Sequence, residues 1–191
     1  MEAPRPGPIS VDEYLRIEAH SDVRHEYVCG LLYAMAGASE RHILICTNLV
    51  IELGTRARRT NCRVLANDML VQVAADHFYY PDIVVVCDPA DNAPLVKRNP
   101  CLIVEVLSPS TTTVDQREKL CVYRQLPGLQ TYLMIDRDER RVDRWWRDAN
   151  AAWRHTELVD SGALPLMCLP GELTLDETYA DVFERTPDTL D

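Results

Sequence analysis

Two stretches decide the fold: Tyr80-Pro81-Asp82-Ile83-Val84-Val85-Val86 and Leu102-Ile103-Val104-Glu105-Val106-Leu107. Each is a run of β-branched and aliphatic residues that contains one carboxylate, and runs this apolar are typical of strands buried on both faces of a sheet. An ionised carboxylate in such a strand loses much of its solvation unless a hydrogen-bond donor or a cation compensates it. The carboxylates of Asp82 and Glu105 are therefore expected to bind one shared cation.

The surrounding chain predicts helices and further strands. Residues 40–58 carry a wide apolar face and are expected to form the central helix, with a further helix at 114–125 after a turn at 108–111. Shorter helices are expected after the capping-box pattern Ser10-Val11-Asp12-Glu13 and at 176–183. Other strands are expected at 26–35, 62–65, 69–73, 131–136, 141–146 and 153–159, and loops at 74–79, 88–99 and 164–171, the second of them bordering a substrate cleft. The sequence predicts one α/β domain, a mixed central β-sheet flanked by helices.

Composition is that of an ordinary globular domain. The chain has 191 residues, 47% hydrophobic and 26% charged, which fits the prior of ~100–200 residues per domain. It has no apolar run of the ~18 residues that a membrane helix needs, and its start has no apolar signal-peptide core. We expect a disordered arm at 1–8, the domain at 9–185 and a tail at 186–191, in a cytoplasmic protein that does not contact a membrane.

Seven cysteines stand at positions 29, 46, 62, 87, 101, 121 and 168. They are not spaced as CxxC and do not alternate with the five histidines at zinc-site intervals. We expect small buried hydrophobic residues in a reducing compartment. A catalytic Cys–His pair is the alternative, formed by Cys29 or Cys46 with His25 or His42.

The net charge of −10 argues against broad affinity for nucleic acid, because binding a polyanion depends on a positive field. The net charge does not exclude a local nucleic-acid-binding site. The candidate is a basic cluster that consists of Arg56, Arg58, Arg59 and Arg63. The alternative is that these residues are the solvated end of a helix, where the dipole favours cations.

The pair Pro81-Asp82 and the stretch Glu105-Val106-Leu107-Ser108-Pro109-Ser110-Thr111 resemble the Uma-two family of endonucleases. That family is a branch of the restriction-endonuclease-like superfamily with the PD-(D/E)xK signature. The resemblance covers residues 9–182 and includes Arg24-His25-Glu26-Tyr27-Val28, residues 34–39 with His42, and residues 115–120 with Tyr123-Arg124. It implies a restriction-endonuclease-like fold and an endonuclease that uses Mg²⁺, or Mn²⁺ as a substitute, to hydrolyse nucleic acid, expected to be DNA.

The resemblance also implies roles for single residues. Asp82, Glu105 and the backbone carbonyl of Val106 would bind the metal. The lysine of the signature is replaced by Leu107, and the resemblance places it instead at Lys119 on the following helix. The accessory candidates are Glu26, His42, Asp115 and Tyr123.

Asp115, Lys119 and Tyr123 are spaced four residues apart and share one helix stripe. The alternative for Lys119 is a surface ion pair with Asp115.

The chain departs from the family pattern beside Gly30, where Cys29 and Leu31 replace acidic residues. These departures, Leu107 and the net charge favour a second hypothesis, an inactive nuclease-fold module that binds nucleic acid or protein. The retained acid pair favours the enzyme.

We also expect a homodimer. A twofold axis would place two basic clusters side by side and would pair two sites for the two strands of a duplex. Trp145, Trp146 and Trp153 could supply apolar contact surface between the subunits or could belong to the core.

Overall fold

The computed structural model of the protein describes residues 7–35, 37–107 and 113–183, without the side chains of residues 113–115. A six-stranded sheet of order β11-β10-β9-β8-β6-β3 forms its centre. The strands are β3 (Arg63–Ala66), β6 (Ile83–Val86), β8 (Leu102–Leu107), β9 (Thr131–Asp136), β10 (Arg141–Arg147) and β11 (Trp153–Val159). Only β8 and β9 run parallel among these neighbouring pairs. The predicted mixed α/β architecture is therefore confirmed.

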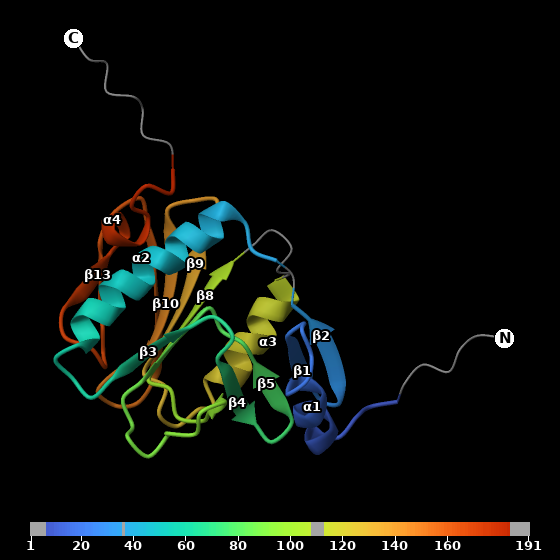
Figure 1. Ribbon diagram of the computed structural model, residues 1–191. Coiled ribbons are helices and arrows are strands. Elements are labelled where there is room, and N and C mark those ends of the chain that lie inside the picture. Colours follow the sequence, from blue (N-terminus) through green and yellow to red (C-terminus); the bar gives the residue numbers. More distant parts are fainter. Residues whose placement is uncertain (1–6, 36, 108–112, 184–191) are drawn as a thin grey trace, which may run out of the picture.

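A second sheet of five strands, order β2-β1-β5-β4-β7, and a two-stranded hairpin lie beside the central sheet. The second sheet contains β1 (His25–Val28), β2 (Leu31–Ala34), β4 (Leu70–Ala74), β5 (His77–Tyr79) and β7 (Val96–Lys97), and the hairpin β12 (Ala163–Pro165) and β13 (Glu172–Thr174). The helices are α1 (Val11–Glu18), α2 (Glu40–Ala57), α3 (Thr113–Tyr123) and α4 (Leu175–Thr178) (Figure 1).

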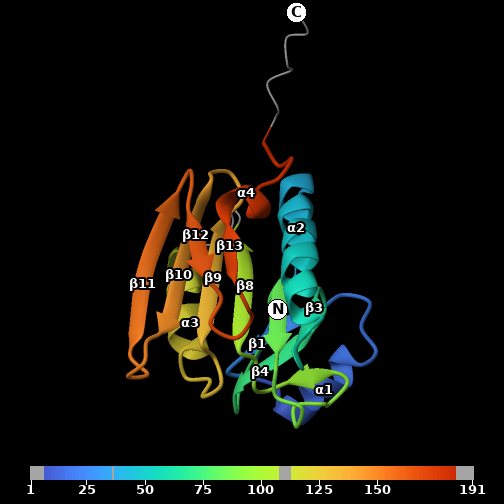
Figure 2. The same cartoon turned by 90° about the vertical axis from the view of Figure 1, so that its left-hand side faces the viewer.

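The central sheet is covered on both faces, which explains its apolar strands. All four residues of β6 are buried. Ile83 and Val85 pack with α2, α4 and the β12–β13 hairpin, whereas Val84 and Val86 pack with α3 and the second sheet. Figure 2 shows the β12–β13 hairpin in front of the sheet and α3 behind it. The predicted burial of this strand on both faces is confirmed.

Helix α2 begins at a serine cap and crosses the sheet with a regular apolar stripe. The Ser39 side chain accepts a hydrogen bond from the backbone N–H of His42, which satisfies one of the free donors of the first turn. Ile45, Leu49 and Leu53 are fully buried at intervals of four residues. This packing directs the first turn of α2, with His42, to one end of the central sheet.

The β1–β2 hairpin confirms one of the two forms expected for residues 26–35, two short strands. Cys29 and Gly30 form the turn with φ of 49° and 91°. A side chain on Gly30 would also collide with Pro8, so both the conformation and the space require glycine there.

Several expected boundaries were wrong. The segments predicted as loops at 74–79 and 88–99 contain the short strands β5 and β7, and the one at 164–171 overlaps β12. Strand β5 forms because Phe78 and Tyr79 are buried while the segment pairs with β1 and β4. The C-terminal helix is limited to Leu175–Thr178, and Asp181 has a φ of 59°, which no α-helix accommodates. The turn expected at residues 108–111 lies outside the described residues.

Candidate active site

A cleft of about 800 Å³ lies where the first turn of α2 meets the central sheet. Strand register brings Asp82 to it, because Ile83 pairs with Val104 in the antiparallel β6–β8 ladder and the next position places Asp82 beside Glu105. Both acids line the cleft together with Glu26, His42 and Lys119.

Asp82 is held by contacts at both carboxylate oxygens. Its Oδ2 accepts a 2.7 Å hydrogen bond from the backbone N–H of Val106. Its Oδ1 lies 2.9 Å from Nε2 of His42. Since an ionised carboxylate only accepts hydrogen bonds, Nε2 of His42 carries the proton in this contact. The carboxylate orientation is therefore set by β8 on one side and by α2 on the other.

Glu105 is contacted by two residues of α3. The Tyr123 hydroxyl donates a 2.8 Å hydrogen bond to its Oε1, and the ammonium of Lys119 lies 3.4 Å from the same atom. The side chains of Glu105 and Lys119 are each only 12% exposed. Because Lys119 and Tyr123 are one helical turn apart, both reach the cleft from one face of α3.

Glu26 contributes a third carboxylate from β1. Its Oε1 accepts a 2.8 Å hydrogen bond from Lys119 and a 3.4 Å one from the backbone N–H of Tyr80. Lys119 thus joins the carboxylates of Glu26 and Glu105 inside the cleft. The alternative of a Lys119 side chain exposed in solvent is wrong, and the side chain of Asp115 lies outside the described part of the chain.

Burial and neighbouring charge set the protonation of the site. Burial raises the pKa of Glu105 to about 7; the Lys119 ammonium opposes this shift, whereas Asp82 and Glu26 add to it. Burial also raises the pKa of Tyr123 above its ordinary value, again with a contribution from Glu105. The site therefore concentrates negative charge in a partly desolvated place, where a cation is favoured.

The cysteine chemistry considered above does not fit these surroundings. Cys46 lies within 4.8 Å of His42 and Asp82, but burial and the charges of Asp82 and Glu105 raise its pKa to about 12. The hydrogen bond to Asp76 raises the pKa of Cys29. Because the thiolate is the nucleophile, both shifts oppose a catalytic Cys–His pair.

The donor atoms fit a hard divalent cation. Within the residues that the structure describes, Oε2 of Glu26 and Oε2 of Glu105 accept no hydrogen bond, so each carboxylate has an oxygen available. Carboxylate oxygens are the ligands that Mg²⁺ prefers. The residues present are thus compatible with the predicted ion, and the role of the Val106 carbonyl stays a prediction.

The structure does not bring the predicted basic cluster to this cleft. Arg56 contacts Glu52 and Glu177, and Arg63 donates to the backbone oxygens of Asp88 and Asp91. Arg56 lies in the last turn of the 18-residue α2 and Arg58 is its C-cap, roughly 20–27 Å along the helix from its first turn. Arg63 begins β3. Likewise, the loop 88–99 is not among the residues that line the cleft.

Arg137 lies at the cleft instead, a placement that the sequence analysis missed. It follows β9 directly, and its Nη1 donates a 3.2 Å hydrogen bond to the Ser39 side chain at the start of α2. Its position directly after β9 could have predicted this placement. Strand β9 runs parallel to β8, and the carboxyl ends of parallel strands lie at the same edge of a sheet.

The departures at Cys29 and Leu31 lie outside the cleft lining. Cys29 instead contacts Asp76 and His77 on the neighbouring turn, and Leu31 is 52% exposed. Leu107 is partly buried and packs against the core on the α3 side of the sheet.

Comparisons with known proteins identify a matching family, related sequences and a related fold. The Uma2 family, described as "Putative restriction endonuclease", matches residues 11–178. Two uncharacterized proteins of Synechocystis sp. are similar in sequence: slr1290 is 31% identical over 90% of this chain and 91% of its own, and sll1609 is 32% identical over 81% and 90%.

A solved structure, a putative nuclease of DUF820 from Anabaena variabilis, has the same fold. Its TM-score is 0.75 at 17% identity, over 92% of this chain and 100% of that one. None of the helices among the described residues has the length and apolar character needed to span a membrane.

Proposed function

The chain belongs to the Uma2 family, and from this premise we propose that it is a metal-dependent endonuclease that hydrolyses phosphodiester bonds in DNA. The observation that carries the proposal is the convergence of Glu26, Asp82 and Glu105 with the ammonium of Lys119 in one cleft. Such a set of hard ligands beside a cation suits phosphate chemistry.

Asp82 and Glu105 would hold Mg²⁺ or Mn²⁺, with Glu26 at the edge of the same site. The bound ion would supply Lewis-acid stabilisation of phosphate charge and an acidified water. His42 and the N–H of Val106 keep the carboxylate of Asp82 in one orientation, and the Tyr123 hydroxyl does the same for Glu105. Lys119 would orient the attacking water and stabilise the charge that develops on the phosphate.

Arg137 and the first turn of α2 would receive a phosphate of the substrate. The free N–H groups and the dipole at a helix N-terminus favour anions. The contact between Arg137 and Ser39 places a guanidinium at the start of this helix. This local positive site replaces the arginine cluster proposed from the sequence.

The alternative is a module with the same fold that binds nucleic acid or protein without cutting. It is favoured by the net charge of −10, because so acidic a chain is a weak partner for DNA by itself. Under the main proposal, a homodimer would offset this weak affinity for DNA, because two clefts would bind one duplex together. We place the protein in the cytoplasm.

The test is cleavage of supercoiled plasmid and of single-stranded DNA and RNA by the wild type, with Mg²⁺ or Mn²⁺. Asp82→Asn and Glu105→Gln should each lower the rate by at least ~100-fold, since a bound metal contributes several kcal/mol and each 1.36 kcal/mol is tenfold. Arg117→Ala, an exposed change on α3, is the matched control. Binding without cleavage of any of these substrates would support the inactive module instead.

A further inference from the structure

Four cysteines from four separate segments meet at the end of the central sheet away from the cleft. Cys62 precedes β3, Cys87 follows β6, Cys101 precedes β8, and Cys168 lies in the β12–β13 turn. The β3–β6 register pairs Arg63 with Val86, so the next position sets Cys62 opposite Cys87, and β8 lies on the other side of β6. Strand order thus creates this sulfur cluster.

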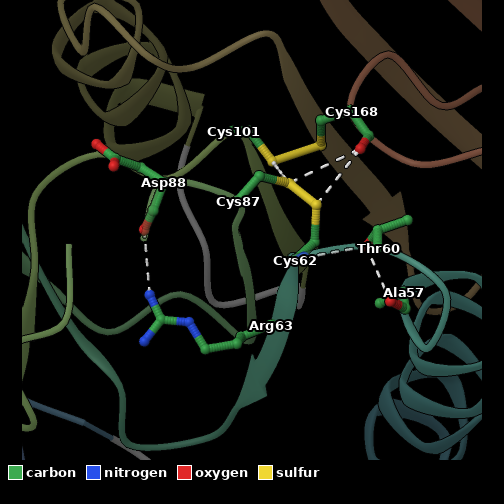
Figure 3. The surroundings of a disulfide bond; sticks show 8 residues. All are labelled: Ala57, Thr60, Cys62, Arg63, Cys87, Asp88, Cys101 and Cys168. Atoms are coloured by element: carbon green, nitrogen blue, oxygen red, sulfur yellow. Dashed lines mark hydrogen bonds between the residues drawn. A yellow bond between two sulfur atoms is a disulfide. The ribbon is translucent and has the colours of Figure 1, made fainter. Parts of the chain in front are cut away.

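The sulfurs form one contiguous group. Disulfides join Cys62 to Cys87 and Cys101 to Cys168. The four pack in or against the main core, as expected of small hydrophobic residues, but the expectation of reduced thiols differs from the disulfide form found here. The sulfurs of Cys87 and Cys101 lie 3.2 Å apart, in different disulfides, and those of Cys87, Cys101 and Cys168 all lie within 4.8 Å of one another. Figure 3 shows both disulfides side by side.

The turn that carries Cys168 has its own anchors. Leu166 and Leu169 are 6% and 4% exposed and belong to the main core. The backbone N–H of Leu166 also donates to the oxygen of Gly171, which closes the turn. The approach of Cys168 to the sheet therefore does not depend on its S–S bond, and the cluster should persist when the thiols are reduced.

We propose that the reduced cluster binds one tetrahedral, thiophilic divalent cation of the zinc class through Cys62, Cys87, Cys101 and Cys168. Four thiolates at ~2.3 Å from zinc form a tetrahedron with edges of about 3.8 Å. The sulfurs of Cys87, Cys101 and Cys168 already lie within 4.8 Å of one another, and Cys62, which is bonded to Cys87 in the disulfide form, supplies the fourth thiolate once that bond is reduced. An all-sulfur set selects zinc over magnesium. The site is therefore chemically distinct from the carboxylate cleft.

The position of the cluster gives such a cation a structural role. Asp82 and Cys87 flank β6, and Cys101 directly precedes β8, which contains Glu105. The two cysteine–acid pairs are therefore separated by roughly 13–17 Å, for four or five residues of extended chain. A cation held by both strands and by the β12–β13 turn fixes the strands that carry the two acids. Local spacing could not reveal this site, because each ligand comes from a different element.

Oxidation converts the metal form into the disulfide form. Four thiolates lose four electrons and form two S–S bonds, while two molecules of hydrogen peroxide take up these electrons with four protons and give four waters. The cation is released because a disulfide sulfur is no longer a thiolate ligand. The two forms are thus alternative states of one cluster.

The experiment uses the full chain, reduced with a phosphine, freed of metal and titrated with Co²⁺ alone. We expect one thiolate-bound Co²⁺ per chain, with the intense thiolate-to-cobalt charge-transfer band and the visible bands of tetrahedral coordination, displaced by Zn²⁺. Peroxide should abolish the bands, and renewed reduction should restore them. Cys87→Ser and Cys168→Ser should lose the charge-transfer intensity, whereas Cys121→Ser, an exposed free cysteine, should keep it.

The wild-type titration decides even if a cysteine variant fails to fold. Reduced protein in which a thiol reagent counts all seven cysteines, yet which gives no thiolate-to-cobalt band at saturating Co²⁺, overturns the proposal. A band that survives unchanged in a folded Cys87→Ser variant also overturns it, because the cation would then be bound elsewhere.

Discussion

Nε2 of His42 lies 2.9 Å from Oδ1 of Asp82, although 40 positions separate the two residues in the chain. The contact joins the first turn of α2 to the residue before β6, and both side chains are 17% exposed. This contact fixes the orientation of the Asp82 carboxylate, which the family resemblance implies is a metal ligand. The neighbours of a ligand determine its orientation and basicity.

Replacing His42 tests this positioning. His42→Ala should weaken metal affinity or cleavage by roughly 10–100-fold, the usual effect of losing a group that orients a ligand. His42→Gln, whose amide can still donate to Asp82, should recover part of the loss. The measurement is the cleavage rate as a function of Mn²⁺ concentration, with the exposed His20→Ala as control. Unchanged metal dependence in His42→Ala would contradict the role.

Lys119 is expected to act in the chemical step. Lys119→Ala should lower the cleavage rate by ~100-fold or more, comparable to the loss of one transition-state donor, while metal affinity is retained because the carboxylates remain. Single-turnover cleavage and calorimetric metal titration measure the two effects separately. Full activity in this variant would exclude the migrated lysine, and Arg117→Ala should behave as wild type.

Two candidate phosphate-binding sites, Arg137 at the cleft and the basic cluster predicted from the sequence, lead to opposite expectations for DNA binding by their variants. Arg137→Gln should weaken binding and reduce the slope of log K against log salt by about 0.9 for each duplex phosphate that the guanidinium neutralises in the wild type. The matched variant Arg58→Gln, exposed at the other end of α2, should change neither quantity. The reverse outcome in salt-dependent binding curves would restore the cluster predicted from sequence.

Glu177 links α4 to α2 and gives a pH-dependent contribution to stability. Partial burial raises its pKa, but the N–H and hydroxyl of Thr174 and the guanidinium of Arg56 outweigh this, and the net pKa lies below the ordinary 4.5. Since the folded-state pKa is depressed, the contribution is fully present above about pH 4.5 and is lost as pH falls through the lower folded value.

Denaturant unfolding of Glu177→Gln measures that contribution. The variant should be less stable than wild type at neutral pH, and the difference should shrink in acid. The related Thr174→Ala, which removes the cap of α4, should cost about 1 kcal/mol at neutral pH. A loss for Glu177→Gln that does not vary with pH would show that the charge of Glu177 is not its source.

Self-association is the fifth expected outcome. The tryptophans are poor candidates for the contact, because Trp145 and Trp153 pack partly buried against the core, as the alternative stated from the sequence expects, and the guanidinium of Arg144 lies over the Trp146 ring. A dimer would still be needed to combine two clefts on one duplex. Sedimentation at micromolar concentration should show it, and a monomer at every salt concentration would remove this explanation of DNA binding by so acidic a chain.

The sequence by itself determined the secondary-structure elements that carry the acids. Buried strands with a single carboxylate are detectable because an apolar run predicts burial on both faces, and a charge there needs compensation. Helical spacing likewise predicted that Lys119 and Tyr123 share a face of α3. These are local properties, readable within a few residues.

Only the tertiary structure decided which distant residues meet. Strand order set Glu26 beside Lys119, the parallel β8–β9 pair brought Arg137 to the cleft, and the registers of β3, β6 and β8 gathered four cysteines that no local spacing relates. The length of α2 places Arg56 and Arg58 far from the first turn of the helix, where the cleft lies. Periodicity defines which face of an element is buried, whereas pairing and register between elements define what that face contacts.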